Sequence, residues 1–297
     1  MNTSKYDVIV AGAGPAGICA AVAAARQGAR VALIERYGVV GGNLTAGYVG
    51  PILGSVGKNT MRDEVCALLG VPDNDWIGEH GKAHDFEEAK LVLAEFIARE
   101  RNIDVFLQCC VSGVIQKGNV VKGIQCASNE GPLRFEAPVT IDCTGDAIVS
   151  FLAGAEIQKG RSSDGLMQPV TLEYTIDGVD ESKGLICIGD VDNVQLNGER
   201  FLDWCKKRAD EGKLPPLLAA VRLHPSVRPG CRQVNTTQAN GVDITLTGSI
   251  FAADLALRQQ IRLLTRFLQE NLPGYEKLPG DRKRCDYRST RKPEGYG

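Results

Sequence analysis

The feature that most constrains the fold of this chain is a glycine-rich turn between an apolar run and a small-residue segment near the N-terminus. The apolar run at 7–11 leads into Gly12-Ala-Gly-Pro-Ala-Gly17, and residues 15–27 follow with the composition of a small-residue helix. A second apolar run at 30–35 comes next. Strand, glycine turn, helix and strand in this order are typical of a βαβ unit that binds a dinucleotide, and they predict a parallel sheet.

Each position of the turn has a physical role in this interpretation. Gly12 permits the tight turn, Gly14 lets the backbone approach a pyrophosphate, and Gly17 lets the helix pack close to the strand. Pro15 and Ala16 begin the helix, whose free N–H groups and positive dipole end favour phosphate. The alternative is a plain glycine turn of an α/β protein. An acidic residue at the end of the second strand, placed to accept the ribose hydroxyls, argues against that alternative.

Three further features favour FAD over NAD as the dinucleotide. A pair of glycines follows the acidic residue and extends the contact beyond the βαβ unit. Three short strands, at 110–116, 120–127 and 132–137, stand where a plain NAD-type fold crosses over through a helix. A strand at 139–143 then ends in small and acidic residues that make a second approach to the cofactor. The candidate contacts added by these features are Glu35, Arg36, Gly41, Gly42, Thr144, Gly145 and Asp146.

These motifs carry a family resemblance that covers residues 6 to about 278. The N-terminal half resembles the glutathione-reductase-like class of FAD-binding oxidoreductases, and more narrowly the bacterial FAD-dependent oxidoreductase family. Residues 35–47 are similar to the family stretch E-R-x-G-x-x-G-G-x-x-T-x-G, and residues 141–146 to I-D-A-T-G-D, with cysteine in the alanine place. The resemblance implies flavin-side contacts from Gly41, Gly42, Asn43 and Thr45, and an adenine contact from the backbone of Val111.

The fold class expected is α/β, with a Rossmann-like FAD-binding domain and a β-meander crossover at 1–154. Helical spacing at 85–101, with Asp85 as N-cap, places a helix before the third parallel strand. A second, strand-and-helix domain is expected at 155–278. It contains a strand at 170–176 that alternates as a half-buried strand should, and a long helix at 249–271 opened by Ser249.

The tail at 279–297 is expected to be disordered. From Asp281 to Gly297 it holds six basic and three acidic residues and lacks Val, Ile, Leu, Met, Phe and Ala, so it cannot bury an apolar face. The resembled family continues with a closing segment instead. Back-translated with permitted codons and read from the second base, the tail yields a Gly-Ala-Arg-Glu-Ser-Arg-Lys core similar to that segment. We therefore expect a chain that is C-terminally truncated or frameshifted.

Composition limits the partners. A net charge of -2 gives no electrostatic case for nucleic acid, and no apolar stretch is long enough to cross a bilayer. Without a signal peptide a cytoplasmic location is expected, with a small-molecule substrate and with homo-oligomerisation left open. No Cys-x-x-Cys motif exists among the ten cysteines, so no metal is expected.

The expected function is transfer of a hydride or electrons between FAD and a small organic substrate. Two alternatives stay open. One is an NAD-binding, non-redox relative of the thiazole-synthase kind, although that family's run of three glycines is absent. The other is a truncated flavoprotein without turnover.

Catalytic residues cannot be assigned from the sequence. His84 precedes a helix N-cap and is expected in a surface loop, whereas His224, in a proline-rich turn, is a candidate for the substrate domain. Arg161 and Gln168 either face the flavin or belong to a plain turn. The pair at 109–110 is interpreted as two cysteines of one strand that face opposite ways rather than as a redox pair.

Overall fold

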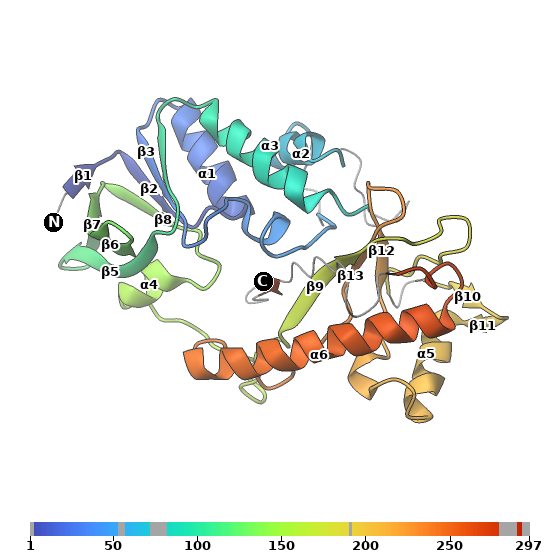
Figure 1. Ribbon diagram of the computed structural model, residues 1–297. Coiled ribbons are helices and arrows are strands. Elements are labelled where there is room, and N and C mark those ends of the chain that lie inside the picture. Colours follow the sequence, from blue (N-terminus) through green and yellow to red (C-terminus); the bar gives the residue numbers. More distant parts are fainter. Residues whose placement is uncertain (1–2, 53–56, 72–81, 190–191, 279–289, 293–297) are drawn as a thin grey trace.

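The computed structural model describes residues 3–52, 57–71, 82–189, 192–278 and 290–292. The chain forms two units that lie side by side, and the N-terminal unit is built in three layers (Figure 1). Its elements are β1 (Thr3–Lys5), β2 (Val8–Ala11), α1 (Pro15–Arg26), β3 (Val31–Ile34), the 3-10 turn η1 (Gly42–Leu44), α2 (Met61–Leu68), α3 (Phe86–Ala98), β4 (Ile103–Phe106), β5 (Cys110–Lys117), β6 (Val120–Ser128), β7 (Gly131–Glu136), β8 (Val139–Asp142) and α4 (Ile148–Leu152).

The middle layer is a parallel sheet in the order β4-β3-β2-β8. Because side chains alternate along a strand, Val10 and Leu33 pack against α1 and α3, while Ile9 and Ala32 pack against the layer on the other side. All four are fully buried. Burial of each large apolar side chain contributes about 1.5 to 3 kcal/mol, which makes these strands the rigid support of their C-terminal loops. The predicted βαβ unit is confirmed.

The third layer is the predicted meander. β5, β6 and β7 pair antiparallel in succession, and β1 adds to the edge of β7 in parallel. Ile124 and Phe135 pack from this sheet onto the parallel sheet. The chain therefore passes from β4 to β8 through three strands, and the predicted β-meander crossover is confirmed. The N-cap at Asp85 is also present, since its carboxylate accepts from the N–H groups of Glu87 and Glu88.

The second unit is a four-stranded antiparallel sheet with helices on one face. The sheet order is β12-β13-β9-β14. Its elements are β9 (Thr171–Ile176), β10 (Gln195–Leu196), β11 (Glu199–Arg200), α5 (Phe201–Asp210), the 3-10 turn η2 (Pro216–Leu218), β12 (Leu223–Pro225), β13 (Arg232–Val234), α6 (Thr247–Asn271) and β14 (Thr290–Lys292).

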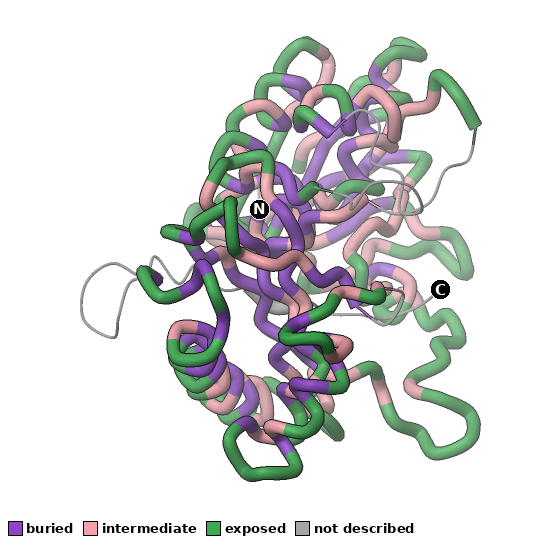
Figure 2. The backbone as a smooth tube through the Cα atoms, turned by 90° about the vertical axis from the view of Figure 1, so that its right-hand side faces the viewer, coloured by how far each residue is buried: buried purple, intermediate pink, exposed green. Residues whose placement is uncertain are grey.

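Two expectations for this unit need correction. β9 was expected to be half-buried, but five of its six residues are buried because it lies between β13 and β14 and is covered on both faces. α6 begins at Thr247, and its N-cap residue, Leu246, has no capping side chain; Ser249 instead donates to the carbonyl of Leu246. Figure 2 shows buried and exposed segments within the same helices. Phe251 of α6 is among the exposed residues, at 74% accessibility.

The buried apolar residues separate along the chain. One core contains residues between 170 and 278, and two others contain residues between 6 and 149. This separation supports the proposed boundary near residue 154. Of the segment expected to be disordered, Thr290–Lys292 pairs with β9 as β14, and the rest lies outside the described residues. No helix in the described ranges has the length and apolar character needed to cross a membrane.

Candidate functional site

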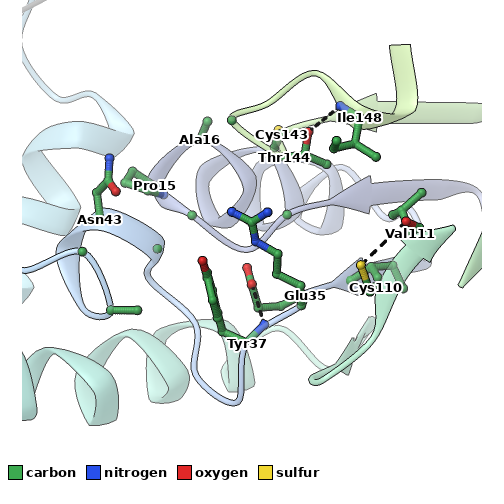
Figure 3. Close-up of a pocket in the computed structure, with 18 of the residues that line it drawn as sticks. Pro15, Ala16, Glu35, Tyr37, Asn43, Cys110, Val111, Cys143, Thr144 and Ile148 are labelled. Atoms are coloured by element: carbon green, nitrogen blue, oxygen red, sulfur yellow. Dashed lines mark hydrogen bonds between the residues drawn. The ribbon is translucent and has the colours of Figure 1, made fainter. Parts of the chain in front are cut away.

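A cavity of about 720 Å³ opens at the carboxyl edge of the parallel sheet. The loops that follow β2, β3, β4 and β8 meet there, as parallel strands require. In Figure 3, Asn43 and Pro15 lie at one end of the cavity and Cys110 and Val111 at the other, with Glu35 and Tyr37 between them. The cavity is thus elongated along the sheet edge, as an extended ligand would need.

The glycine turn shapes the cavity floor. A Cβ at Gly12 would lie 2.2 Å from the carbonyl oxygen of Cys143, and one at Gly17 only 1.7 Å from the carbonyl oxygen of Gly12. Both positions therefore exclude any side chain. A Cβ at Gly14 would meet nothing closer than the Cα of Gly42, 4.0 Å away, so the fold itself leaves this position open. A glycine there keeps the space free for a ligand rather than for the protein.

The N-terminus of α1 faces the same space. Its N-cap residue is Gly14, which has no side chain to accept the hydrogen bonds of the first turn. Pro15 has no N–H to satisfy, and Ala16 lines the cavity. A twelve-residue helix with uncapped donors at its N-terminus is suited to hold an anion such as a pyrophosphate.

Glu35 follows β3 and is held rigidly. One carboxylate oxygen accepts from the N–H of Ala13 at 2.8 Å, and the other accepts from the N–H of Tyr37 at 2.9 Å. The residue is 5% exposed yet borders the cavity. Each carboxylate oxygen has a further acceptor site, so the group can take two ribose hydroxyls without releasing the backbone.

Asp142 at the end of β8 organises the second approach to the cavity. One carboxylate oxygen accepts from the N–H and hydroxyl of Thr144, at 3.1 and 2.7 Å, and the other from the N–H and hydroxyl of Ser150, at 2.8 and 2.9 Å. Burial alone would raise its pKa, but these four hydrogen bonds outweigh burial and hold the pKa of the carboxyl below its ordinary value. The Thr144 hydroxyl in turn accepts from the N–H of Ile148 at 2.9 Å.

Most of the predicted cofactor contacts come together at this cavity. Those that line it are Gly12, Gly14, Pro15, Ala16, Glu35, Arg36, Gly42, Asn43, Val111, Thr144 and Gly145. The remaining four predicted residues do not line the cavity and instead contact the residues around it. Gly17 packs against the turn, Gly41 donates its N–H to Ala13, Asp146 pairs with Arg36 at 3.2 Å, and the buried hydroxyl of Thr45 donates to the carbonyl of Val40 at 2.6 Å.

Other lining residues were not singled out from the sequence. Tyr37 and Gly47 lie within the resembled stretch, so their neighbours could have indicated them. Leu172 of β9 and Asp254 of α6 come from the second unit, and no local pattern marks them. Asp254 is paired with Arg258 at 2.8 Å, so this lining carboxylate is held by an ion pair.

His84 does not lie at the surface, contrary to expectation. It is 1% exposed, and its Nε2 and Nδ1 lie 2.6 Å and 3.2 Å from the carbonyl oxygens of Leu44 and Gly50. The neighbouring Ala83 pairs with Ser226 of the second unit, which draws this segment inward. Burial lowers the pKa of His84 despite the two carbonyl contacts.

Of the other candidate residues, some lie where the sequence predicts and some do not. Arg161 and Gln168 are exposed and do not border the cavity, as a plain turn would have them. Cys109 is buried and Cys110 is exposed, as expected of residues that face opposite ways, but only Cys110 belongs to a strand, because β5 begins there. His224 lies buried on β12 rather than in a turn.

The chain is similar to known proteins in family, in sequence and in structure. The model of a family described as FAD dependent oxidoreductase matches residues 7–295. The chain is 27% identical over 180 residues to the thiamine thiazole synthase of Pyrococcus horikoshii, which covers 56% of the chain and 69% of that protein. It is 30% identical over 158 residues to the soluble pyridine nucleotide transhydrogenase of a Marinomonas species, covering 49% of the chain and 32% of that protein. The chain thus spans about a third of the length of the transhydrogenase.

Two solved structures share the fold. A geranylgeranyl bacteriochlorophyll reductase-like protein from Thermoplasma acidophilum superposes with a TM-score of 0.53 at 17% identity, covering 98% of this chain and 66% of that one. The p-nitrophenol 4-monooxygenase of Pseudomonas putida gives 0.50 at 15% identity, with 98% and 67% covered. At these identities the likeness concerns architecture alone.

Proposed function

The chain belongs to the FAD dependent oxidoreductase family, and from this premise we propose that it transfers a hydride or electrons between FAD and a small organic substrate. The observation that carries the proposal is the elongated cavity, which is lined by the glycine turn, by the acidic ribose site at Glu35 in its middle and by residues of the second unit (Figure 3). Such a cavity fits an extended dinucleotide with a substrate at one end.

Each part of the site has a share in holding the cofactor. Glu35 accepts the ribose hydroxyls, the N-terminus of α1 and the turn at Gly14 hold the pyrophosphate, and Val111 faces the adenine. The loop that carries Asn43 lies at the flavin side. When bound, FAD supplies the two-electron chemistry. The residues of this chain orient the cofactor, and the second unit excludes water from its reactive end.

The first test is the identity of the cofactor. We would purify the chain, denature it, and identify the released nucleotide by its fluorescence and by chromatography. Release of FAD is the expected result. Release of NAD would instead favour the thiazole-synthase-like alternative, which the family match does not favour. Release of neither, and no binding of added FAD in a titration, would contradict the proposal.

The second test separates an enzyme from a flavoprotein without turnover. The FAD-loaded chain would be mixed with candidate substrates in the absence of oxygen, and the flavin absorbance near its visible maximum would be followed. Bleaching by a substrate, reversed by an electron acceptor, is the expected result. A chain that binds FAD but is bleached by dithionite alone would support the non-catalytic alternative.

A further inference from the structure

One face of the sheet in the second unit is made of polar side chains. Directly paired residues of an antiparallel sheet point to the same side, and the register pairs His224 with Gln233 and Gln233 with Thr175. Glu173 and Thr171 alternate with the core-facing residues of β9 and so share this side. The opposite side carries the apolar core, which includes Leu172, Tyr174, Ile176, Leu223 and Val234.

This polar face is deeply buried. Glu173 and Gln233 are 1% exposed and His224 is 3% exposed. Burying such groups costs free energy unless hydrogen bonds compensate. The amide nitrogen of Gln233 donates to the carboxylate of Glu173 and, at 3.1 Å, to the carbonyl of Tyr48. In the described part of the chain, the buried Oε1 of Gln233 and Oγ1 of Thr175 have no hydrogen-bond partner.

The polar face approaches the cofactor cavity through one contact. Asn43 and Gly47 line the cavity, and the next residue, Tyr48, accepts the hydrogen bond from Gln233. In Figure 1, β9 and β13 stand beside the loop that carries η1. A molecule that extends from the flavin side of the cavity past Tyr48 would therefore meet this face.

We propose that Glu173, Thr175, His224 and Gln233 form the substrate-recognition surface, and that the substrate is a small molecule with O–H or N–H donors, an alcohol or an amine. The inference rests on the proposed function and names its substrate class. The unused oxygen atoms of Gln233 and Thr175 accept hydrogen bonds from such a molecule. Glu173 contributes a carboxyl group to the same face, and an acidic group there disfavours a second carboxylate or a phosphate beside it.

Binding of three matched probes to the FAD-supplemented full chain tests the substrate class. Benzyl alcohol, benzylamine and benzoate share one ring and differ in the polar group. Saturation-transfer NMR at millimolar concentration should detect the alcohol, the amine or both, and not benzoate. Binding of the amine alone would assign an ammonium substrate, and binding of the alcohol alone a neutral one. Benzoate binding as well as the donors, or no donor binding at all, would overturn the proposal.

Substitutions locate the binding surface. Thr175→Val removes one acceptor without changing the side-chain shape, and should weaken donor binding about fivefold, as expected for one hydrogen bond. Thr140→Val on β8 is the matched control, because the Thr140 hydroxyl is also buried without a hydrogen-bond partner and lies off the polar face. Gln233→Leu provides a second variant. Unchanged donor affinity in both face variants would overturn the assignment.

The cofactor is measured separately in every variant. FAD content should be the same in wild type, Thr175→Val and Thr140→Val, since none of these hydroxyls borders the cavity. Donor binding without FAD binding would refute the proposed function and leave the recognition surface standing. FAD binding without donor binding would refute the recognition surface and leave the proposed cofactor in place.

Discussion

Replacing Asp142 by Asn tests whether one carboxylate holds the second approach to the cofactor. Its two oxygens together accept four hydrogen bonds, two from Thr144 and two from Ser150. An Asn side chain keeps one oxygen and presents an NH₂ group in place of the other. That NH₂ group faces an N–H and a hydroxyl, of which only the hydroxyl can turn to accept. One backbone N–H is left without an acceptor.

The magnitude follows from these contacts. Hydrogen bonds to a charged group contribute about 1.5 to 3 kcal/mol each, and the loss of one with partial retention of the others gives about 2 kcal/mol. For a chain of this size that is a fall in Tm of about 4 to 8 °C. Thermal unfolding by circular dichroism measures it, with the exposed Asp177→Asn as a control expected to change stability by less than about 0.5 kcal/mol.

The pH dependence gives the same prediction a second readout. Because the folded-state pKa of Asp142 is lowered, its contribution is present above the unfolded value, about 3.9, and is lost as the pH falls through the folded value. Wild type and Asp142→Asn should therefore converge in stability at low pH. FAD affinity should fall in the variant at neutral pH, since the loop at Thr144 loses its anchor. Equal Tm and equal FAD affinity at pH 7 would refute the role given to Asp142.

Three other outcomes are expected. Gly14→Ala should fold with a Tm near that of wild type, because its Cβ meets no closer atom than 4.0 Å, yet bind FAD at least about tenfold more weakly in a titration. Gly17→Ala should fail to give a cooperative unfolding transition, since its Cβ would lie 1.7 Å from the carbonyl oxygen of Gly12. Burial lowers the pKa of His84, so at low pH the unfolded chain binds a proton that the folded chain does not. The free energy of unfolding should therefore decline as the pH falls below about 6.5. Urea unfolding between pH 5 and 8 measures this decline, which should be smaller in His84→Gln.

The N-terminal unit could be predicted from the sequence because its signals are local. The run at 7–11, the glycine turn and the acid at Glu35 each specify an element or its end, and the turn residues between 110 and 137 specify the meander. The burial of His84 was not predictable in this way. It depends on the pairing of Ala83 with Ser226, a contact between residues far apart in the sequence.

The same reasoning explains why the sequence does not indicate every residue that lines the flavin side of the cavity. Asp254 belongs to a helix whose apolar spacing indicates only that it packs on a core. That this helix brings a carboxylate to the cavity depends on how the second unit lies against the first. The alternation along β9 was visible in the sequence, but it was interpreted as one face in water. In the structure the polar face is buried against the loop at Tyr48.

The charged residues that line the cavity determine both how the cofactor's pyrophosphate can be held and which substrates can bind beside it. Among the described lining residues, Glu35, Asp142 and Asp254 are acidic, and Arg36 is the one cation, already paired with Asp146. A dianionic pyrophosphate in such a site cannot be held by side-chain ion pairs and must depend on backbone N–H groups and the dipole of α1. Those donors are fixed at one place, the turn after β2. Any further anion would meet carboxylates without such compensation, so the arrangement that admits a dinucleotide also selects against acidic substrates at the other end.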